Sequence, residues 1–240
     1  MFVFLALVFG LGFVIFGIGS DQGTGIGDIL RDSGGASSGN VSLSDAREQV
    51  QENPKSAEAQ RNLATALLED GQEEEAIAAL NRYLVLEPTD QNALRELAGI
   101  HLAQGSVAAQ QAQAEQVRAS FRTFGTTFGN PLQGSNGQAI GTDPIDEAIS
   151  TQSNQAISEA YTKAQQSFQS AVAAYEKLVT VAPDDPNVQL ELAQAAQQAG
   201  DYTKAIGAYE RFLKLAPDDP SAAIVKQQIA QLKAALAPPG

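Results

Sequence analysis

Few residues in this 240-residue sequence could carry chemistry. It has no cysteine, one methionine and one histidine, His101. A thiolate nucleophile, a cysteine-ligated zinc site and a haem attachment motif are therefore excluded. Because no second histidine and no serine–histidine–aspartate arrangement accompany His101, we interpret it as a core residue with one hydrogen bond.

The acidic residues form short clusters that suit helix ends better than catalysis. Glu73, Glu74 and Glu75 stand where negative charge favours a helix N-terminus. Asp184–Asp185 and Asp218–Asp219 follow expected helix ends, where aspartate is a turn former, and a calcium loop needs more oxygen ligands at alternating spacing. No carboxylate pair lies in an apolar setting suited to acid–base work. The sequence therefore predicts a protein that is not an enzyme and that has no catalytic, cofactor-binding or metal-binding residue.

The overall charge argues against nucleic acid as a partner. There are 28 acidic and 15 basic residues, which give a formal net charge of -13. A field of this sign repels phosphates, and protein affinity for nucleic acid comes mostly from neutralising the phosphate backbone. We therefore expect the partners to be proteins.

The N-terminal segment is the most apolar part of the chain. Residues 2–18 contain no charged side chain and are dense in Phe, Leu, Val and Ile. As a helix, residues 1–19 would be about 28 Å long, close to the thickness of a bilayer core. We expect a transmembrane anchor here. A signal peptide is the alternative, although the basic segment that normally precedes its apolar part is missing.

The residues after this segment indicate its orientation. Asp21 and Asp28 precede the first cation, Arg31, so nothing basic holds the following chain in the cytoplasm. We therefore expect a single-pass membrane protein whose soluble domain lies on the extracytoplasmic side. Residues 20–41 are rich in Gly, Ser and Asp, which predicts a flexible linker.

Four prolines end helical runs in similar contexts, at Pro54, Pro88, Pro183 and Pro217. The first two and the last two are each 34 residues apart. Alignment on these prolines brings small and large residues into register. They are Ala64, Ala98 and Ala193; Gly71, Gly105 and Gly200; Ala76, Ala171 and Ala205; Leu80, Tyr175 and Tyr209; and Tyr83, Leu178 and Phe212.

This pattern resembles the tetratricopeptide repeat (TPR), a pair of antiparallel helices, called A and B, over residues 42–104 and 166–236. The resemblance implies an all-α fold, a TPR-like α-solenoid of about three helix hairpins spanning residues 42–236, with residues 237–240 as a tail. Each hairpin leaves an apolar face open, so the repeats must stack. Residues 42–52 are expected as a leading helix and residues 221–236 as a closing helix with Val225, Ile229, Leu232 and Leu236 on its apolar stripe.

The middle repeat contains a long insertion. Pro88 and Pro183 are 95 residues apart, 61 more than one period allows. Asp143–Pro144 is a well-formed helix start, and nothing breaks the helix from Pro144 to Val181, so it would be about 57 Å long. We predict a long antiparallel helical arm at about residues 105–165. Its expected apolar stripe is Ile145, Ile149, Ala156, Ala160, Ala164, Phe168 and Ala171.

The far end of this arm is predicted to be irregular and to carry aromatic residues. Phe121, Phe124 and Phe128 begin an irregular segment, and the tip at residues 122–143 is rich in glycine. Exposed apolar side chains on a loop argue for a partner or a second copy of the chain. The alternative is that the three rings fold back onto the arm or the repeats.

The resemblance to TPR proteins also implies an inner wall, formed mainly by A helices, that binds peptides or partner domains. Here that wall is polar and mixed in charge. Because Glu96 and Glu191 stand where a carboxylate clamp needs cations, we do not expect binding of a chaperone C-terminal tail. The candidate partner-binding residues are Arg61, Thr65, Glu69, Arg95, Glu96, Glu191 and Gln194 on the wall, and Phe121, Phe124 and Phe128 on the arm.

Together these features predict a membrane-anchored TPR protein of bacterial type, a scaffold that mediates protein–protein interaction in the cell envelope. The polar wall favours specific contacts of this kind. The phenylalanine-bearing tip keeps an alternative open, an assembly factor or chaperone for exported client proteins. Self-association through the anchor or the arm is compatible with either function.

Overall fold

The computed structural model describes residues 41–128 and 144–237, except for the side chains of residues 122–128 and 144–147. The chain divides into two units, residues 1–39 and 40–240, and all described residues belong to the second. The predicted anchor lies outside the described residues, as does most of the predicted linker. Among the helices that are described, none is both long and apolar enough to span a membrane.

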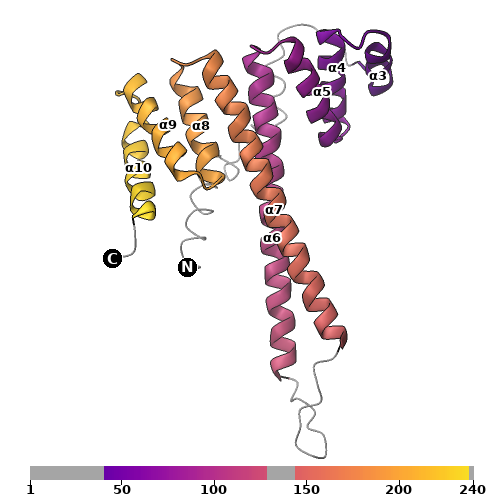
Figure 1. Cartoon of the computed structure of the whole chain (residues 1–240), viewed down its shortest axis with the longest axis vertical. Coiled ribbons are helices and arrows are strands. Elements are labelled where there is room, and N and C mark those ends of the chain that lie inside the picture. The colour runs from indigo at the N-terminus through magenta and orange to yellow at the C-terminus, as the bar shows by residue number, and fades with distance from the viewer. Residues whose placement is uncertain (1–40, 129–143, 238–240) are drawn as a thin grey trace, which may run out of the picture. The chain divides into compact units, whose positions relative to one another are not determined.

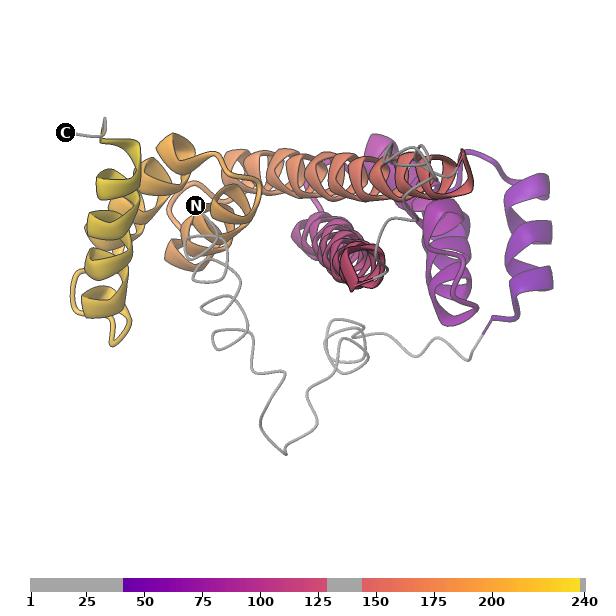
Figure 2. The same ribbon diagram turned by 90° about the horizontal axis from the view of Figure 1, so that it is seen from below.

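In this part of the chain the regular elements are helices, which confirms the all-α prediction (Figure 1). Each helix packs mainly against its neighbours in sequence, as in a stack of helix hairpins. Figure 2 shows α3 to α5 on one side of the α6–α7 pair and α8 to α10 on the other. The helices are α3 (Leu43–Glu52), α4 (Ala57–Glu69), α5 (Glu73–Leu86), α6 (Gln91–Phe128), α7 (Pro144–Val181), α8 (Pro186–Gln198), α9 (Tyr202–Leu215) and α10 (Ala222–Leu236).

The helix starts follow the four prolines. Two positions after each proline stands a short polar residue, and its side-chain oxygen accepts a hydrogen bond from a backbone N–H two or three residues further on, at 2.7–3.2 Å. These residues are Ser56, Asp90, Asp185 and Asp219. Each therefore satisfies a backbone donor that the first turn of a helix leaves unpaired.

Two of the three aligned glycines make the turns between helices. Gly71 and Gly200 have φ angles of 74° and 78°, in the left-handed region that glycine enters without steric cost. The following residues close the turns, because Gln72 and Asp201 donate backbone hydrogen bonds of 2.8 and 2.9 Å to carbonyls five residues earlier. The sequence prediction of turns at Gly71 and Gly200 is confirmed.

The third aligned glycine, Gly105, lies inside a helix instead of a turn. A Cβ added to Gly105 would lie 2.6 Å from Cδ1 and Cε1 of the Phe168 ring, so only glycine allows this contact. Phe168 is buried there with Ala108, Ala109 and Ala164. The chain therefore runs on past the expected turn as a second, separate apolar cluster forms.

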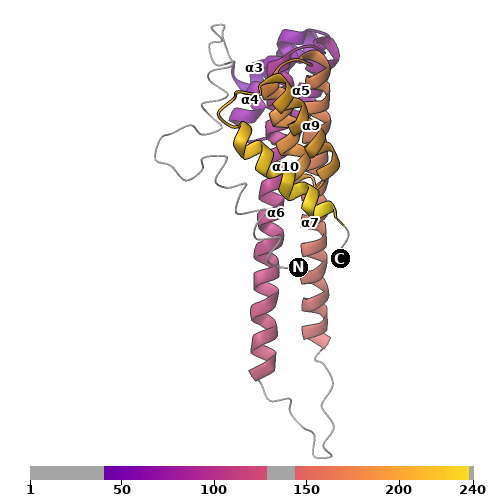
Figure 3. The ribbon, with the colours of Figure 1, turned by 90° about the vertical axis from the view of Figure 1, so that its left-hand side faces the viewer.

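Beyond this contact α6 and α7 form the arm, here defined as α6 after Gly105 and α7 before Phe168. Figures 1 and 3 show the two helices side by side. Small side chains line their seam and allow close approach. The buried members are Ala108, Ala109 and Ala112 of α6 and Ser153, Ala160, Ala164 and Ser167 of α7.

Most of the arm prediction is confirmed, with two corrections. Helix α7 has the predicted bounds, Pro144–Val181. The predicted irregular segment from Phe121 is wrong, because α6 stays helical to Phe128. The apolar stripes also end earlier than predicted, since Ile149 and Leu236 are 38% and 51% exposed near the ends of their helices. Ile145 lies outside the described side chains.

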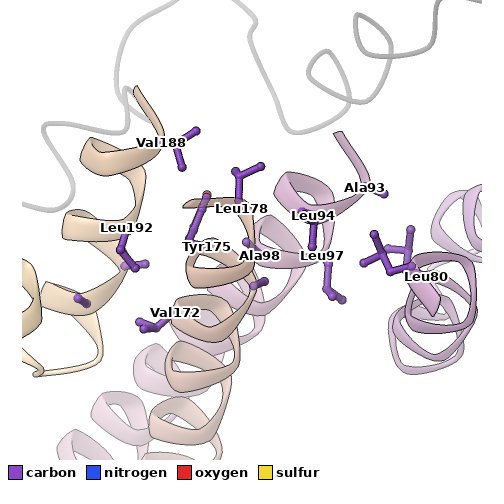
Figure 4. Packing of buried hydrophobic residues seen from close by; sticks show 14 of the residues in the cluster. Leu80, Ala93, Leu94, Leu97, Ala98, Val172, Tyr175, Leu178, Val188 and Leu192 are labelled. Carbon is purple, nitrogen blue, oxygen red and sulfur yellow. The ribbon is translucent and has the colours of Figure 1, made fainter. Parts of the chain in front are cut away.

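The main core joins the middle repeat to both neighbours (Figure 4). Tyr175 and Leu178 of α7 lie among residues of α6 and α8, including Ala98 and Leu192. Leu80 of α5 packs in the same cluster from the other side of α6. Burial of these side chains removes the open apolar face that each hairpin would have alone.

Two glycines of α6 should respond oppositely to the same substitution. Gly105→Ala drives a methyl group into the buried Phe168 ring, and we expect a loss of about 1–3 kcal/mol in the free energy of unfolding. Gly99→Ala is the matched control, because no atom lies within 4 Å of its added Cβ, and it should gain about 0.5–1 kcal/mol. Urea unfolding measures both. Equal effects would contradict the proposed contact.

Candidate functional site

The predicted wall residues lie on three helices that begin successive repeats. We call the surface of α4, α6 up to Gln104, and α8 the A-helix face. Thr65 and Glu69 are exposed on α4, and Gln194 is half-buried on α8. The structure brings Arg61 together with Glu96, and it brings Arg95 together with Glu191. Sequence analysis identified these residues but did not predict the pairs.

The first pair joins α4 to α6 and is the more buried. Arg61 Nη1 lies 2.5 Å from Glu96 Oε2, and only 7% of the Glu96 side chain is exposed. The guanidinium carbon also lies 5.7 Å from the centre of the Tyr83 ring, within reach of a cation–π interaction. Burial raises the pKa of Glu96, and the nearby Arg61 charge opposes that rise. This ion pair is therefore largely shielded from water.

The second pair joins α6 to α8 and is more exposed. Arg95 Nε lies 3.1 Å from both carboxylate oxygens of Glu191, and Nη2 lies 3.4 Å from Asp185 Oδ2. About a third of each of these three side chains is exposed. Burial raises the pKa of Glu191, while Arg95 acts to lower it. Since Asp185 also caps α8, Arg95 contacts both the start and the middle of that helix.

These pairs repeat with the period of the fold, and we call them the ion-pair ladder. Arg61 and Arg95 stand seven residues after Pro54 and Pro88, and each pairs with the glutamate eight residues after the next proline. The third repeat has Leu190 at the arginine position, so the ladder ends there. The periodic signal was present in the proline alignment.

A second contact links α5 to the start of α6. The Tyr83 hydroxyl donates a 2.6 Å hydrogen bond to Asp90 Oδ2, while Asp90 Oδ1 accepts from the backbone N–H groups of Asn92 and Ala93. Burial and this bond raise the pKa of Tyr83 to about 12. Burial acts to raise the pKa of Asp90 too, but the hydrogen bonds it accepts outweigh burial and hold the pKa below its ordinary value.

Next to the ladder runs an uncharged row that we call the neutral strip. It consists of Thr65, Gly99 and Gln194, each eleven residues after the proline of its repeat. Thr65 and Gly99 are exposed. Gly99 leaves open space, because nothing lies within 4 Å of the position that a Cβ would take. The strip therefore has its lowest point in the middle repeat.

The only histidine gives no sign of catalysis. His101 is half-buried on α6, where burial lowers its pKa and a hydrogen bond with Gln104 acts in the opposite direction. Within residues 41–128 and 144–237, no three or more His, Asp or Glu side chains gather where they could hold a metal ion.

The arm carries the remaining predicted site residues. Phe121 is 71% exposed on α6. The side chains of Phe124 and Phe128 lie outside the described residues. A shallow hollow of about 430 Å³ lies nearby, lined by Glu115, Arg118, Gln152, Ser153 and Ala156.

Two family models, each described as a tetratricopeptide repeat, match residues 57–100 and 157–230. Neither match includes residues 101–156, which contain most of the arm. No curated protein matches the chain.

Solved structures of repeat proteins also match it. The crystal structure of MamA is 15% identical, with a TM-score of 0.43, over 80% of this chain and 75% of that one. A thermophilic TPR protein of Thermus thermophilus is 14% identical, with a TM-score of 0.25, over 80% and 89%. YrrB, a TPR protein with an unusual peptide-binding site, is 12% identical, with a TM-score of 0.25, over 78% and 100%.

The two ladder pairs should differ in strength. Double-mutant cycles that combine Arg61→Met with Glu96→Gln should give a coupling energy of about 1–3 kcal/mol, because this pair is shielded from water. The same changes at Arg95 and Glu191 should give about 1 kcal/mol or less, since that pair is partly solvated. Urea unfolding at low and high salt measures both. A larger or less salt-sensitive coupling at Arg95 would contradict the assignment.

The cap of α6 should make stability depend on pH. The folded-state pKa of Asp90 is below its ordinary value of 3.8, so its carboxylate stabilises the fold fully above that pH, and this contribution is lost as the pH falls through the lowered pKa. Asp90→Asn keeps a capping oxygen but removes the charge. The wild type should therefore be the more stable near neutral pH. The difference should disappear in strong acid, and a difference that stays constant with pH would refute this origin.

Proposed function

This chain is a tetratricopeptide repeat protein, and we propose that it is a membrane-tethered scaffold that binds another protein on its A-helix face. The observation that carries the proposal is the neutral strip beside the ion-pair ladder. The ladder already neutralises the nearby arginines and glutamates, so a partner segment meets hydrogen-bonding groups and little net charge. At Gly99 the main chain of that segment can approach the helix closely.

The ladder also supports this role through rigidity. Arg61 and Arg95 each join two successive A helices by side-chain contacts, so the spacing of Thr65, Gly99 and Gln194 is set before any partner arrives. A surface ordered in advance loses less conformational entropy when it binds. Recognition of one specific partner, rather than of many unrelated clients, is the function that such a surface favours.

The tether rests on the amino-acid sequence. Residues 2–18 carry no charge and are long enough to cross a bilayer as a helix. Asp21 and Asp28 precede the first cation, which supports a soluble domain on the extracytoplasmic side of a bacterial cell envelope. The partner is then another protein of that compartment.

The test compares two glycines that are alike in exposure and differ in position. Gly99 on the A-helix face and Gly207 on α9 are both exposed, helical and free of neighbours within 4 Å of an added Cβ. Gly99→Leu fills the middle of the strip without disturbing the fold. We expect it to reduce partner capture by crosslinking in native membranes by about tenfold or more, because it blocks close approach at the centre of the interface.

Gly207→Leu is the matched control and should capture the partner as the wild type does. A chain that lacks residues 2–18 should leave the membrane fraction. Equal capture by the Gly99 and Gly207 variants would reject the A-helix face as the binding surface. Recovery of a diffuse set of exported proteins by every variant would instead support an assembly factor, for which exposed Phe121 on the arm is the favourable observation.

A further inference from the structure

The solvent side of α6 carries an apolar row within the arm. Ala112 is buried against α7, and Phe121 follows it by nine residues, which is about two and a half helical turns, so the two side chains point to opposite sides. Val107, Val117 and Phe121 are 64%, 53% and 71% exposed. Three large apolar side chains on the water side of one helix are unusual in a chain this acidic, and they need an explanation.

Their spacing is that of a coiled-coil seam. Val107, Ala114 and Phe121 are seven residues apart, and Gln110 and Val117 each follow by three, which gives the a and d positions of a heptad repeat. We call these five residues the outer stripe. In the sequence the same spacing continues at residues 124 and 128, both phenylalanine. Among the described side chains of α7, the solvent side is polar, with Gln155, Thr162, Gln166 and Gln169 exposed.

A strict a/d stripe fits another helix better than it fits a membrane surface. Helices that lie on membranes have a wide apolar face bordered by several lysines or arginines. The outer stripe is narrow, contains Gln110, and has only Arg118 among its flanking charges. We propose that the outer stripe packs against the outer stripe of a second copy of this chain.

Charge favours a second copy at this place. The whole chain has a net charge of -13, so most of its surface repels another copy. Residues 105–128 carry one acidic residue, Glu115, and two basic ones, Arg118 and Arg122, so this segment is slightly positive. Glu115 is paired with Arg118 at 2.5 Å. Two outer stripes can therefore meet without the repulsion that the rest of the surface would impose.

The helix is also prepared for such a contact. Packing against α7 holds α6 helical through the arm, so pairing does not have to supply the cost of helix formation. A seam of three heptads is about 33 Å long, which is a small interface, so we expect reversible association on the order of micromolar affinity. The contact is isologous, because each copy presents the same residues.

The test uses single cysteines, since the chain has none of its own. Full-length chains with Ala114→Cys or Val117→Cys in native membranes should crosslink to dimers with a short bis-maleimide, whether the stripes pair parallel or antiparallel. Gln166→Cys, on the solvent side of α7, should not. Adding Phe121→Glu to Val117→Cys should reduce the dimer about tenfold, whereas adding Gln169→Glu, with the same charge change, should leave it unchanged.

Three outcomes would overturn the proposal. They are equal crosslinking at positions 117 and 166, an undiminished dimer with Phe121→Glu, and a dimer reduced equally by Gln169→Glu. Phe121 is exposed, so thermal unfolding of the Phe121→Glu chain should match the wild type and exclude misfolding as the cause. The result is independent of partner capture at Gly99, because that residue lies on the A-helix face and not on the outer stripe.

Discussion

The contact between the Phe168 ring and the backbone of Gly105 determines how this chain departs from a simple repeat stack. In the flanking repeats the aligned glycine turns the chain through a positive φ angle, and the B helix begins two residues later. At Gly105 the helix runs on, and the missing side chain becomes the space into which an aromatic ring packs. One residue type serves both purposes because each depends on the absence of a Cβ.

The sequence around that glycine explains the different outcome. Gly71 and Gly200 are followed by Gln72 and Asp201, whose backbone N–H groups close the turn. Gly105 is followed by an Ala- and Gln-rich stretch that forms helix readily and that meets a row of small residues on α7. Two helices with small residues at their seam can approach closely over a long distance, so tertiary packing rewards continuing the helix more than turning it.

Periodic features of the fold could be predicted from the sequence, and non-periodic ones could not. Prolines and glycines at fixed spacing located most helix ends because each acts locally. The helical state of residues 121–128 was missed because Gly125 and its threonine neighbours are weak helix formers, and the preference of single residues is overridden by the helix already in place. The ion-pair ladder was missed for another reason. Arg61 and Glu96 are visible in the sequence, but only the stacking distance between helices brings them together.

Helix α6 places two surfaces of different character on one rigid element. Its first turns carry Arg95, Glu96 and Gly99, and its later turns carry the outer stripe, with Gly99 and Val117 separated by about 27 Å along the axis. Ala199 at the end of α8 packs against the Phe168 cluster, which fastens the base of the arm to the third repeat as well. If two outer stripes pair, the two A-helix faces are therefore held at a set distance. A partner with two copies of the recognised segment would then bind more tightly than either face alone allows, since the second contact forms at high effective concentration.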